Sequence, residues 1–207
     1  AEANEAFGAE LKKGKKADAQ RGYEIACKEW MDVRSFGQVF AFKGSDLSLG
    51  IRGPVSVQPA FSVDPIDITS MQITKSVNSE DKEGKSSDTM GMKHRVDFGV
   101  YILKGSINVQ LSEKTGFTEE DAEKIKEAIR TLFVNDSSSA RPDGSMVMHK
   151  LYWWKHNCKI GQYSSHKVHN SIEIKKKEGV RNPRKIEDYE IICHELPGLA
   201  VEEYEGL

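Results

Sequence analysis

The feature that most limits the possible folds is a long polar stretch between two segments with the pattern of β-strands. Residues 67–76 (DITSMQITKS) and 94–103 (HRVDFGVYIL) are rich in β-branched and aromatic residues. Between them lies SVNSEDKEGKSSDTMGMK, which is polar and contains Gly and Ser. Connections longer than about 12–15 residues are uncommon in compact domains unless they are functional or disordered. The sequence therefore predicts a protruding, partly mobile hairpin.

The first half of the chain combines helix and strand signals. Residues 17–31 place Tyr23, Ala26, Cys27 and Trp30 on one face of a helix, which predicts core packing. Gly37 ends this helical register, and a strand is expected to begin at Val39. Residues 51–63 alternate like a half-buried strand, but Pro54 and Pro59 lack the N–H that a central strand needs. This segment is therefore predicted to be an edge strand or a bulged strand.

The second half continues the mixture, so the fold class is predicted to be α+β. A turn at Lys104–Gly105 predicts that residues 95–111 form a hairpin. The clearest helix spans residues 118–133, where Thr118 can cap the first turn with Asp121 three residues on. Further strands are expected in residues 146–156, 168–175 and 189–194.

Charge is unevenly distributed along the chain. The formal net charge of -2 first indicates a protein with no affinity for nucleic acid. However, residues 141–185 hold eleven basic and three acidic residues, a local net of +8, while residues 187–207 hold seven acidic residues and no Lys or Arg, a net of -7. The basic block suits a polyanionic partner or is a solvated face, and both readings stay open. The acidic end is expected to pack near a basic surface of the same or a neighbouring subunit.

Enzymatic and metal-binding motifs are weak. The patterns GxGxxG, GxxxxGK[ST], HExxH and GxSxG are absent. His166 and His169, with His156 and Cys158, could suggest a metal, but zinc sites usually have tighter Cys/His pairing. Three cysteines without a CxxC favour a reducing compartment, and there is neither an apolar run for a membrane helix nor a secretory leader. The sequence thus predicts no catalytic site, no metal, no cofactor and no membrane contact.

Small residues next to basic ones recur in RSFG, RGP, MGMKHR and SSAR. Glycine allows a backbone to approach a phosphate closely, and Arg offers a forked set of charged donors. Each motif alone is more often an ordinary turn than a binding site.

Taken in order, these motifs resemble one family. The ordered set is DVRSFG, IRGPVSVQPAFSVDPIDI, DTMGMKHRVDFGVY, LSEKTGFTEEDAE and SSSARPDGSM. It is similar to the backbone subunit of type I CRISPR surveillance (Cascade) complexes, nearest the subtype I-C branch of the Cas-seven family, from about Tyr23 through Tyr189.

The resemblance implies a modified RNA-recognition-motif fold with a ferredoxin-like palm, helical fingers and an inserted thumb hairpin at residues 70–96. Residues 1–207 would form one such domain, but the family's first strand and its Asn-Pro-Asn-Gly-Asp type loop are not in this sequence. We therefore expect a partial domain that lacks its N-terminal strand. The implied partners are CRISPR RNA, target DNA through guide pairing, further copies of the subunit and other Cascade subunits, in the prokaryotic cytoplasm and in antiviral defence.

The resemblance also implies a set of RNA contacts. They are expected from the palm, the base of the thumb and a later loop, and they are Arg34, Arg52, Gly53, Gln58, Ser62, Met90, Lys93, His94, Arg95 and Arg141. Two alternatives to this non-catalytic role remain open. One is a metal-dependent RNA endonuclease of a related CRISPR effector, although the acidic residue of such enzymes lies in an early loop that this sequence lacks. The other is a stand-alone single-stranded nucleic-acid-binding protein.

Overall fold

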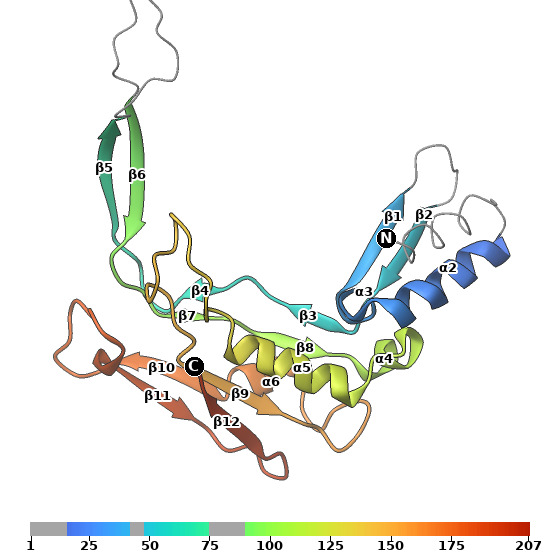
Figure 1. Ribbon diagram of the computed structural model, residues 1–207. Coiled ribbons are helices and arrows are strands. Elements are labelled where there is room, and N and C mark those ends of the chain that lie inside the picture. Colours follow the sequence, from blue (N-terminus) through green and yellow to red (C-terminus); the bar gives the residue numbers. More distant parts are fainter. Residues whose placement is uncertain (1–15, 42–47, 75–89) are drawn as a thin grey trace, which may run out of the picture. The chain divides into compact units, whose positions relative to one another are not determined.

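The computed structural model describes residues 16–41, 48–74 and 90–207 (Figure 1). The chain divides into two compact units. Unit 1 contains residues 1–58, 105–171 and 195–207, and unit 2 contains residues 59–104 and 172–194. The fold is α+β, as predicted, with every strand in a two-stranded antiparallel pair. The RNA-recognition-motif arrangement expected for residues 1–207 stays a prediction.

Unit 1 carries the described α-helices and six strands. In chain order its elements are α2 (Lys16–Glu29), α3 (Met31–Phe36), β1 (Gly37–Ala41), β2 (Ser48–Arg52), β3 (Val55–Val57), β8 (Gly105–Ile107), α4 (Val109–Thr115), α5 (Glu119–Arg130), β9 (Lys150–Trp154), α6 (Ser165–His169) and β12 (Val201–Glu205).

The main hydrophobic core of unit 1 lies between α2, α3 and the β1–β2 hairpin. Ala26 and Cys27 of α2 are buried against Val33 of α3 and against Leu49 and Ile51 of β2. The other residues predicted for the apolar face of α2, Tyr23 and Trp30, pack against this cluster. The predicted helix over residues 17–31 and the strand after it are confirmed, with the helix divided at Trp30.

The expected strand over residues 51–63 is divided into three pieces. The breaks fall at the two prolines, because neither can donate to a ladder: β2 ends before Pro54, and β3 ends before Pro59. After Pro59 the chain enters unit 2, where Phe61 and Ser62 form a strand of their own.

The predicted hairpin over residues 95–111 is wrong. Its two halves do not pair with each other: Gly105–Ile107 pairs with β3, and Tyr101–Ile102 pairs with Phe61–Ser62. Beyond Ile107 the chain is helical, because the Asn108 side chain accepts a hydrogen bond from the Leu111 backbone N–H at 3.0 Å and so caps α4. A strong local capping signal therefore outweighs the apolar alternation of that segment.

The helix predicted over residues 118–133 is α5, and its predicted cap is present. The Thr118 hydroxyl accepts from the Asp121 N–H, and the Asp121 carboxylate accepts from the Thr118 N–H at 3.0 Å. The strand expected in residues 146–156 is β9. A second cluster in unit 1 is formed by Val168, Leu196 and Leu199, with Trp154 and Tyr163 packed against it.

The acidic end of the chain forms β12, a strand that the sequence did not predict. It pairs with β9, which brings three of its glutamates to basic side chains of the same unit. Lys150 of β9 forms ion pairs with Glu203 and Glu205. The expectation that the acidic end packs near basic side chains is thus confirmed for Glu202, Glu203 and Glu205, and the lysines belong to the same chain.

Lys126 of α5 holds β12 from the other side. It is only 6% exposed, and its ammonium lies 2.9 Å from Glu202 of β12 and 2.9 Å from Glu123. The same ammonium lies 5.1 Å from the Trp153 ring centroid and 5.3 Å from that of Tyr204. Burial acts to lower the pKa of Lys126, but the hydrogen bonds from Lys126 to Glu202, Glu123 and Tyr204 outweigh it, so the pKa is raised.

The described part of unit 2 consists of strand pairs and one short 3₁₀ helix. Its elements are β4 (Phe61–Ser62), β5 (Ile68–Thr74), β6 (Met90–Val96), β7 (Tyr101–Ile102), β10 (Ile172–Lys176), η1 (Ile186–Asp188) and β11 (Tyr189–Cys193).

The two longest strands of unit 2 form the β5–β6 ribbon, and β10 pairs with β11. The expected strands near 67–76, 168–175 and 189–194 are thus present with shifted bounds, whereas the single strand expected over 94–103 is wrong: the chain leaves β6 after Val96 and forms the separate strand β7. The ribbon's second strand begins earlier than predicted, at Met90, and residues 168–169 belong to α6. The polar connection and its predicted mobility fall largely on residues 75–89, outside the described residues.

We predict that Lys126→Ala lowers the free energy of unfolding by about 2 kcal/mol, because two cation–π contacts and both ion pairs of the buried ammonium are lost together. Urea unfolding measures this change. The control is Lys124→Ala on the same helix, whose ion pair with Glu120 is exposed at both ends and contributes about 0.5 kcal/mol or less. Equal stabilities of the two variants would contradict this role of Lys126.

Candidate nucleic-acid interface

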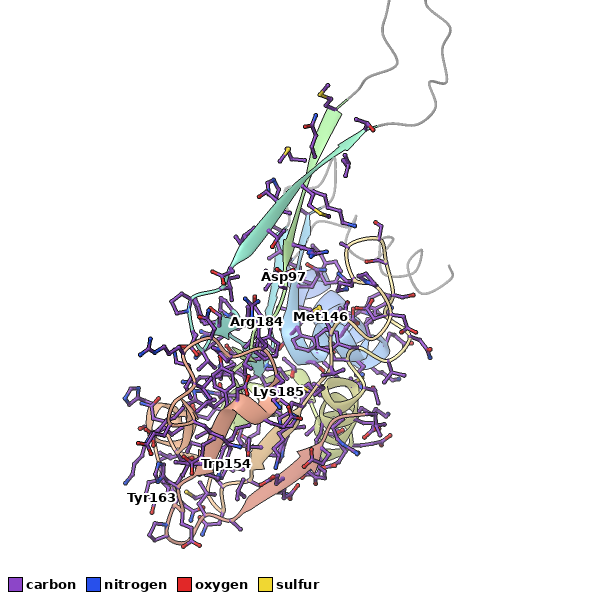
Figure 2. All side chains as sticks on the ribbon, turned by 90° about the vertical axis from the view of Figure 1, so that its left-hand side faces the viewer. Asp97, Met146, Trp154, Tyr163, Arg184 and Lys185 are labelled. Carbon is purple, nitrogen blue, oxygen red and sulfur yellow. The ribbon has the colours of Figure 1, made fainter. Side chains whose placement is uncertain are left out.

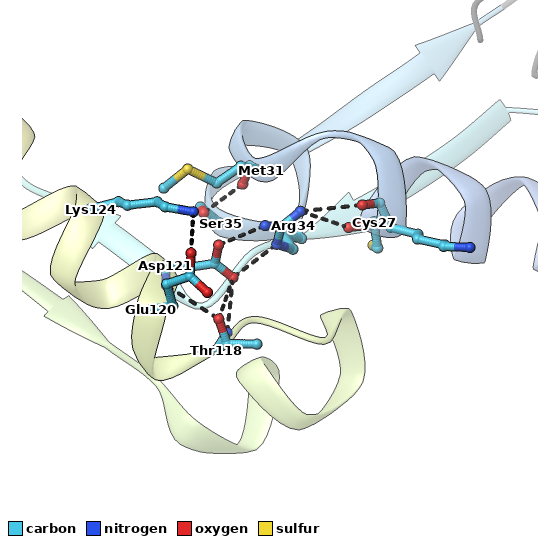
Figure 3. Close-up of polar contacts among 9 residues, drawn as sticks. Cys27, Met31, Arg34, Ser35, Thr118, Glu120, Asp121 and Lys124 are labelled. Atoms are coloured by element: carbon cyan, nitrogen blue, oxygen red, sulfur yellow. Dashed lines mark hydrogen bonds and ion pairs between the residues drawn. The ribbon is translucent and has the colours of Figure 1, made fainter.

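Arg34, the first of the expected RNA contacts, is bound within unit 1 (Figure 3). Its Nε and Nη2 donate to the two Asp121 oxygens at 2.9 and 2.6 Å, and its Nη1 lies 3.4 Å from the carbonyl oxygens of Cys27 and Lys28. All three guanidinium nitrogens therefore have partners in the protein. RNA contact by Arg34 stays a prediction, while its contacts in the structure join α2 and α3 to the start of α5.

Asp121 is the buried partner in the ion pair with Arg34. Its side chain is 2% exposed and accepts hydrogen bonds from Arg34 and from the backbone and hydroxyl of Thr118. The hydrogen bond from Arg34 is the main cause that lowers the pKa of Asp121 from 3.8 to about 2. The capping pattern identified Asp121 in the sequence, but nothing in the sequence indicated that Arg34 is its partner.

The RSFG and RGP motifs lie against each other in unit 1. In the β1–β2 hairpin Gly37 faces Arg52. A Cβ atom on Gly53 would lie 2.2 Å from the Ser35 carbonyl oxygen and 2.5 Å from the Gly37 nitrogen, and Gly37 itself has φ 83°. The close backbone approach that the sequence suggested for a phosphate is thus made, at Gly53, to the protein's own backbone.

Arg52 and Gln58 differ from Arg34 in being exposed. Arg52 ends β2 directly before Gly53, Gln58 follows β3, and both side chains are exposed. Arg52 forms no ion pair with a carboxylate among residues 16–41, 48–74 and 90–207. Its guanidinium is available to an anionic ligand.

The expected contacts of the β5–β6 ribbon are divided between its two faces. Because side chains alternate along a strand, Met90 and His94 lie on one face, and Lys93 and Arg95 lie on the other. His94 Nδ1 is 2.8 Å from the Ser70 hydroxyl across the ribbon, while Arg95 Nε donates to Asp97 at 2.8 Å. All seven residues of β6 are exposed. A ligand that touches one face of the ribbon therefore meets only two of these four side chains.

The last two expected residues lie apart from these groups. Ser62 is half-buried in β4 of unit 2, paired with Tyr101. Arg141 is in the exposed loop after α5, where its Nε and Nη2 donate to the Asp136 carboxylate at 3.0 and 3.1 Å. The structure thus brings Gly53 and Arg52 together in unit 1 and the ribbon residues together in unit 2.

Two further features are absent from the described part of the chain. No cluster of three or more His, Cys, Asp or Glu side chains that could hold a metal ion occurs there. Among the same residues, no helix is long and apolar enough to span a bilayer.

A scan against protein-family models gives one match for this chain. Residues 2–194 match the model described as CRISPR-associated protein Cas7. A search of curated proteins finds no match to the chain.

We predict that Gly53→Ala destabilises the protein by about 2–3 kcal/mol, because the added methyl group collides with backbone atoms that cannot move aside. Gly50→Ala is the control, since no atom lies within 4 Å of a Cβ at that position of the same strand pair. Thermal unfolding of the two variants measures the difference. If Gly53→Ala unfolded at the temperature of the parent protein, the tight contact between the two motifs would be refuted.

Proposed function

The chain belongs to the CRISPR-associated protein Cas7 family, and from this membership we propose that it is a non-catalytic, RNA-binding backbone subunit of a type I Cascade complex. The family match, which covers residues 2–194, is the observation that carries this proposal. In this role copies of the subunit, together with other Cascade subunits, assemble along the CRISPR RNA. The protein holds the RNA backbone while base pairing by the guide selects the target DNA. The motif order favours subtype I-C, and the setting is antiviral defence in the prokaryotic cytoplasm.

The β5–β6 ribbon is the proposed thumb, part of the hairpin insertion over residues 70–96. Two observations support this role. The ribbon has the longest strand pairing of the described residues, and almost all of its side chains are exposed. No described element of unit 2 covers either face, and the side chains of the ribbon project from it in Figure 2. A ribbon that buries so little apolar surface within its own unit is suited to cover a ligand.

The proposed RNA contacts differ in what their side chains already do. Arg52 and Lys93 are exposed and form no ion pair with a carboxylate among the described residues, so their charge can serve a phosphate. Arg34, Arg95 and Arg141 each bind an aspartate. We therefore assign the main phosphate contacts to Arg52, in the proposed palm, and to Lys93, in the proposed thumb. The other expected residues are assigned secondary contacts, and they are Arg34, Gly53, Gln58, Ser62, Met90, His94, Arg95 and Arg141.

We predict that the protein binds CRISPR RNA with an affinity that falls steeply with salt, because binding releases counterions from the phosphates. Arg52→Ala and Lys93→Ala each remove one phosphate contact, so each makes the slope of log affinity against log salt shallower by about 0.7. Filter binding between 50 and 200 mM salt measures the slopes.

The control for this experiment is Lys124→Ala, because the Lys124 ammonium already faces the Glu120 carboxylate at 2.7 Å. Its slope is expected to equal that of the parent protein. Slopes for Arg52→Ala and Lys93→Ala that matched the Lys124→Ala slope would contradict the assignment of these two contacts. A parent protein with no measurable affinity for CRISPR RNA would contradict the proposed function itself.

A further inference from the structure

The loop between β10 and β11 in unit 2 carries a concentration of positive charge that the expected RNA contacts do not include. We define the β10–β11 loop as residues 177–185. Its charged side chains are one glutamate, Glu178, and four cations, all exposed, and the cations are Lys177, Arg181, Arg184 and Lys185. These four make up a large part of the basic block in the sequence.

The cations of the β10–β11 loop differ in their ion pairing from the lysines that precede them. None of the four forms an ion pair with a carboxylate in the part of the chain that the structure describes. The preceding lysines behave differently, since Lys175 pairs with Glu173 at 2.9 Å and Lys176 pairs with Asp64 at 3.0 Å. The two lysines at the end of β10 are therefore paired with carboxylates, whereas the four cations of the loop are not paired with a described carboxylate.

The backbone of the loop is held in place by Asp188 at the end of η1. The Asp188 carboxylate accepts from the backbone N–H groups of Arg184 and Lys185 at 2.7 and 3.2 Å. The Asp188 carbonyl accepts from the Lys177 N–H at 2.9 Å, which closes the loop between its two ends. Because the backbone is fixed before a ligand arrives, less conformational entropy is lost on binding.

The loop is joined to the base of the β5–β6 ribbon. Asp64, which precedes β5, accepts from the Tyr189 hydroxyl of β11 at 2.8 Å and pairs with Lys176 of β10. The hydrogen bond from Tyr189 is the main cause that lowers the pKa of Asp64, and the contact with Lys176 adds to it. Burial, together with the hydrogen bond to Asp64, raises the pKa of Tyr189 to about 12. At neutral pH the Asp64 carboxylate is therefore ionised and the Tyr189 hydroxyl is protonated, so the hydrogen bond between them is kept.

A second contact region lies at the end of β6. Asp97 accepts from the Thr69 hydroxyl at 2.7 Å and from Arg95. The pKa of Asp97 is lowered mainly by the Thr69 hydrogen bond, with smaller effects of Arg95 and of the nearby Arg184 charge. Asp97, Arg184 and Lys185 are labelled in Figure 2. Arg184 of the loop thus lies near enough to Asp97 for its charge to act on that carboxylate, just beyond the strand that carries Lys93 and Arg95.

We propose that the β10–β11 loop is a second phosphate-binding surface, and that its ligand is the backbone of the same RNA strand that contacts the base of the β5–β6 ribbon. This inference rests on the proposed function. The contact is with phosphates and independent of sequence, because lysine and arginine side chains suit phosphate oxygens and the loop holds no aromatic side chain on which a base could stack.

The test compares two double variants of the full protein in RNA binding. Arg184→Gln/Lys185→Gln removes two of the proposed phosphate contacts, so the slope of log affinity against log salt becomes shallower by about 1.4. That change corresponds to about a 25-fold weaker affinity at 100 mM salt, equal for RNAs of different sequence. The control is Lys155→Gln/Lys159→Gln, whose ammonium groups already face Glu119 and Glu113, and its slope stays that of the parent protein.

A second measurement needs no variant. Acetylation of the parent protein, with and without RNA, is read by mass spectrometry, and RNA is expected to protect Lys177 and Lys185 but not Lys159. Three results would overturn the inference and leave the proposed function standing. They are a salt slope of Arg184→Gln/Lys185→Gln equal to that of the parent protein, acetylation of Lys177 and Lys185 that RNA does not reduce, and a loss of affinity confined to the complementary DNA strand. A parent protein that binds no RNA would overturn the proposed function and this inference with it.

Discussion

The ion pair between Arg34 and Asp121 is the interaction on which the arrangement of unit 1 depends. It links α3 to the first turn of α5, and the Asp121 carboxylate is almost completely buried. Removal of one partner of such a pair leaves an uncompensated buried charge, which costs about 3–5 kcal/mol. Because the pKa of Asp121 is lowered to about 2, its contribution to stability is fully present above its usual pKa of 3.8 and is lost as the pH falls through 2. The RSFG and RGP motifs occupy this same region, so part of what made them noticeable in the sequence is structural.

The net charge of -2 includes an acidic and a basic group of residues whose charges have different partners. The glutamates of β12 are compensated within unit 1 by Lys126 and Lys150. The cations of the β10–β11 loop in unit 2 have no such partners among the described residues. The acidic end therefore stabilises the fold, whereas the uncompensated part of the basic block remains for a polyanion. The two readings of the basic block that the sequence left open apply to different residues: Lys150 is structural, and the loop cations are proposed to bind RNA.

Features controlled by neighbouring residues were predictable from the sequence. The apolar face of α2 and the Thr118 cap depend on residues within one or two helical turns, and both are confirmed. Partners distant in sequence were not predictable, because no local pattern encodes them. This accounts for the wrong hairpin at 95–111, for the unpredicted strand β12, and for Arg34, whose aspartate lies 87 positions away. The binding residues were harder to predict, because Arg34 and Arg52 both lie next to small residues in the sequence. Only the structure shows that Arg34 is paired with Asp121 whereas Arg52 is exposed.

In the proposed function, this member of the Cas7 family holds a guide RNA through exposed cations rather than acting on RNA as an enzyme. Sequencing of the RNA that co-purifies with the full-length protein from its native cells tests this most directly. The expected result is a defined RNA that consists of a CRISPR repeat and spacer. Recovery of random cellular RNA would contradict it and would indicate a general single-strand-binding protein.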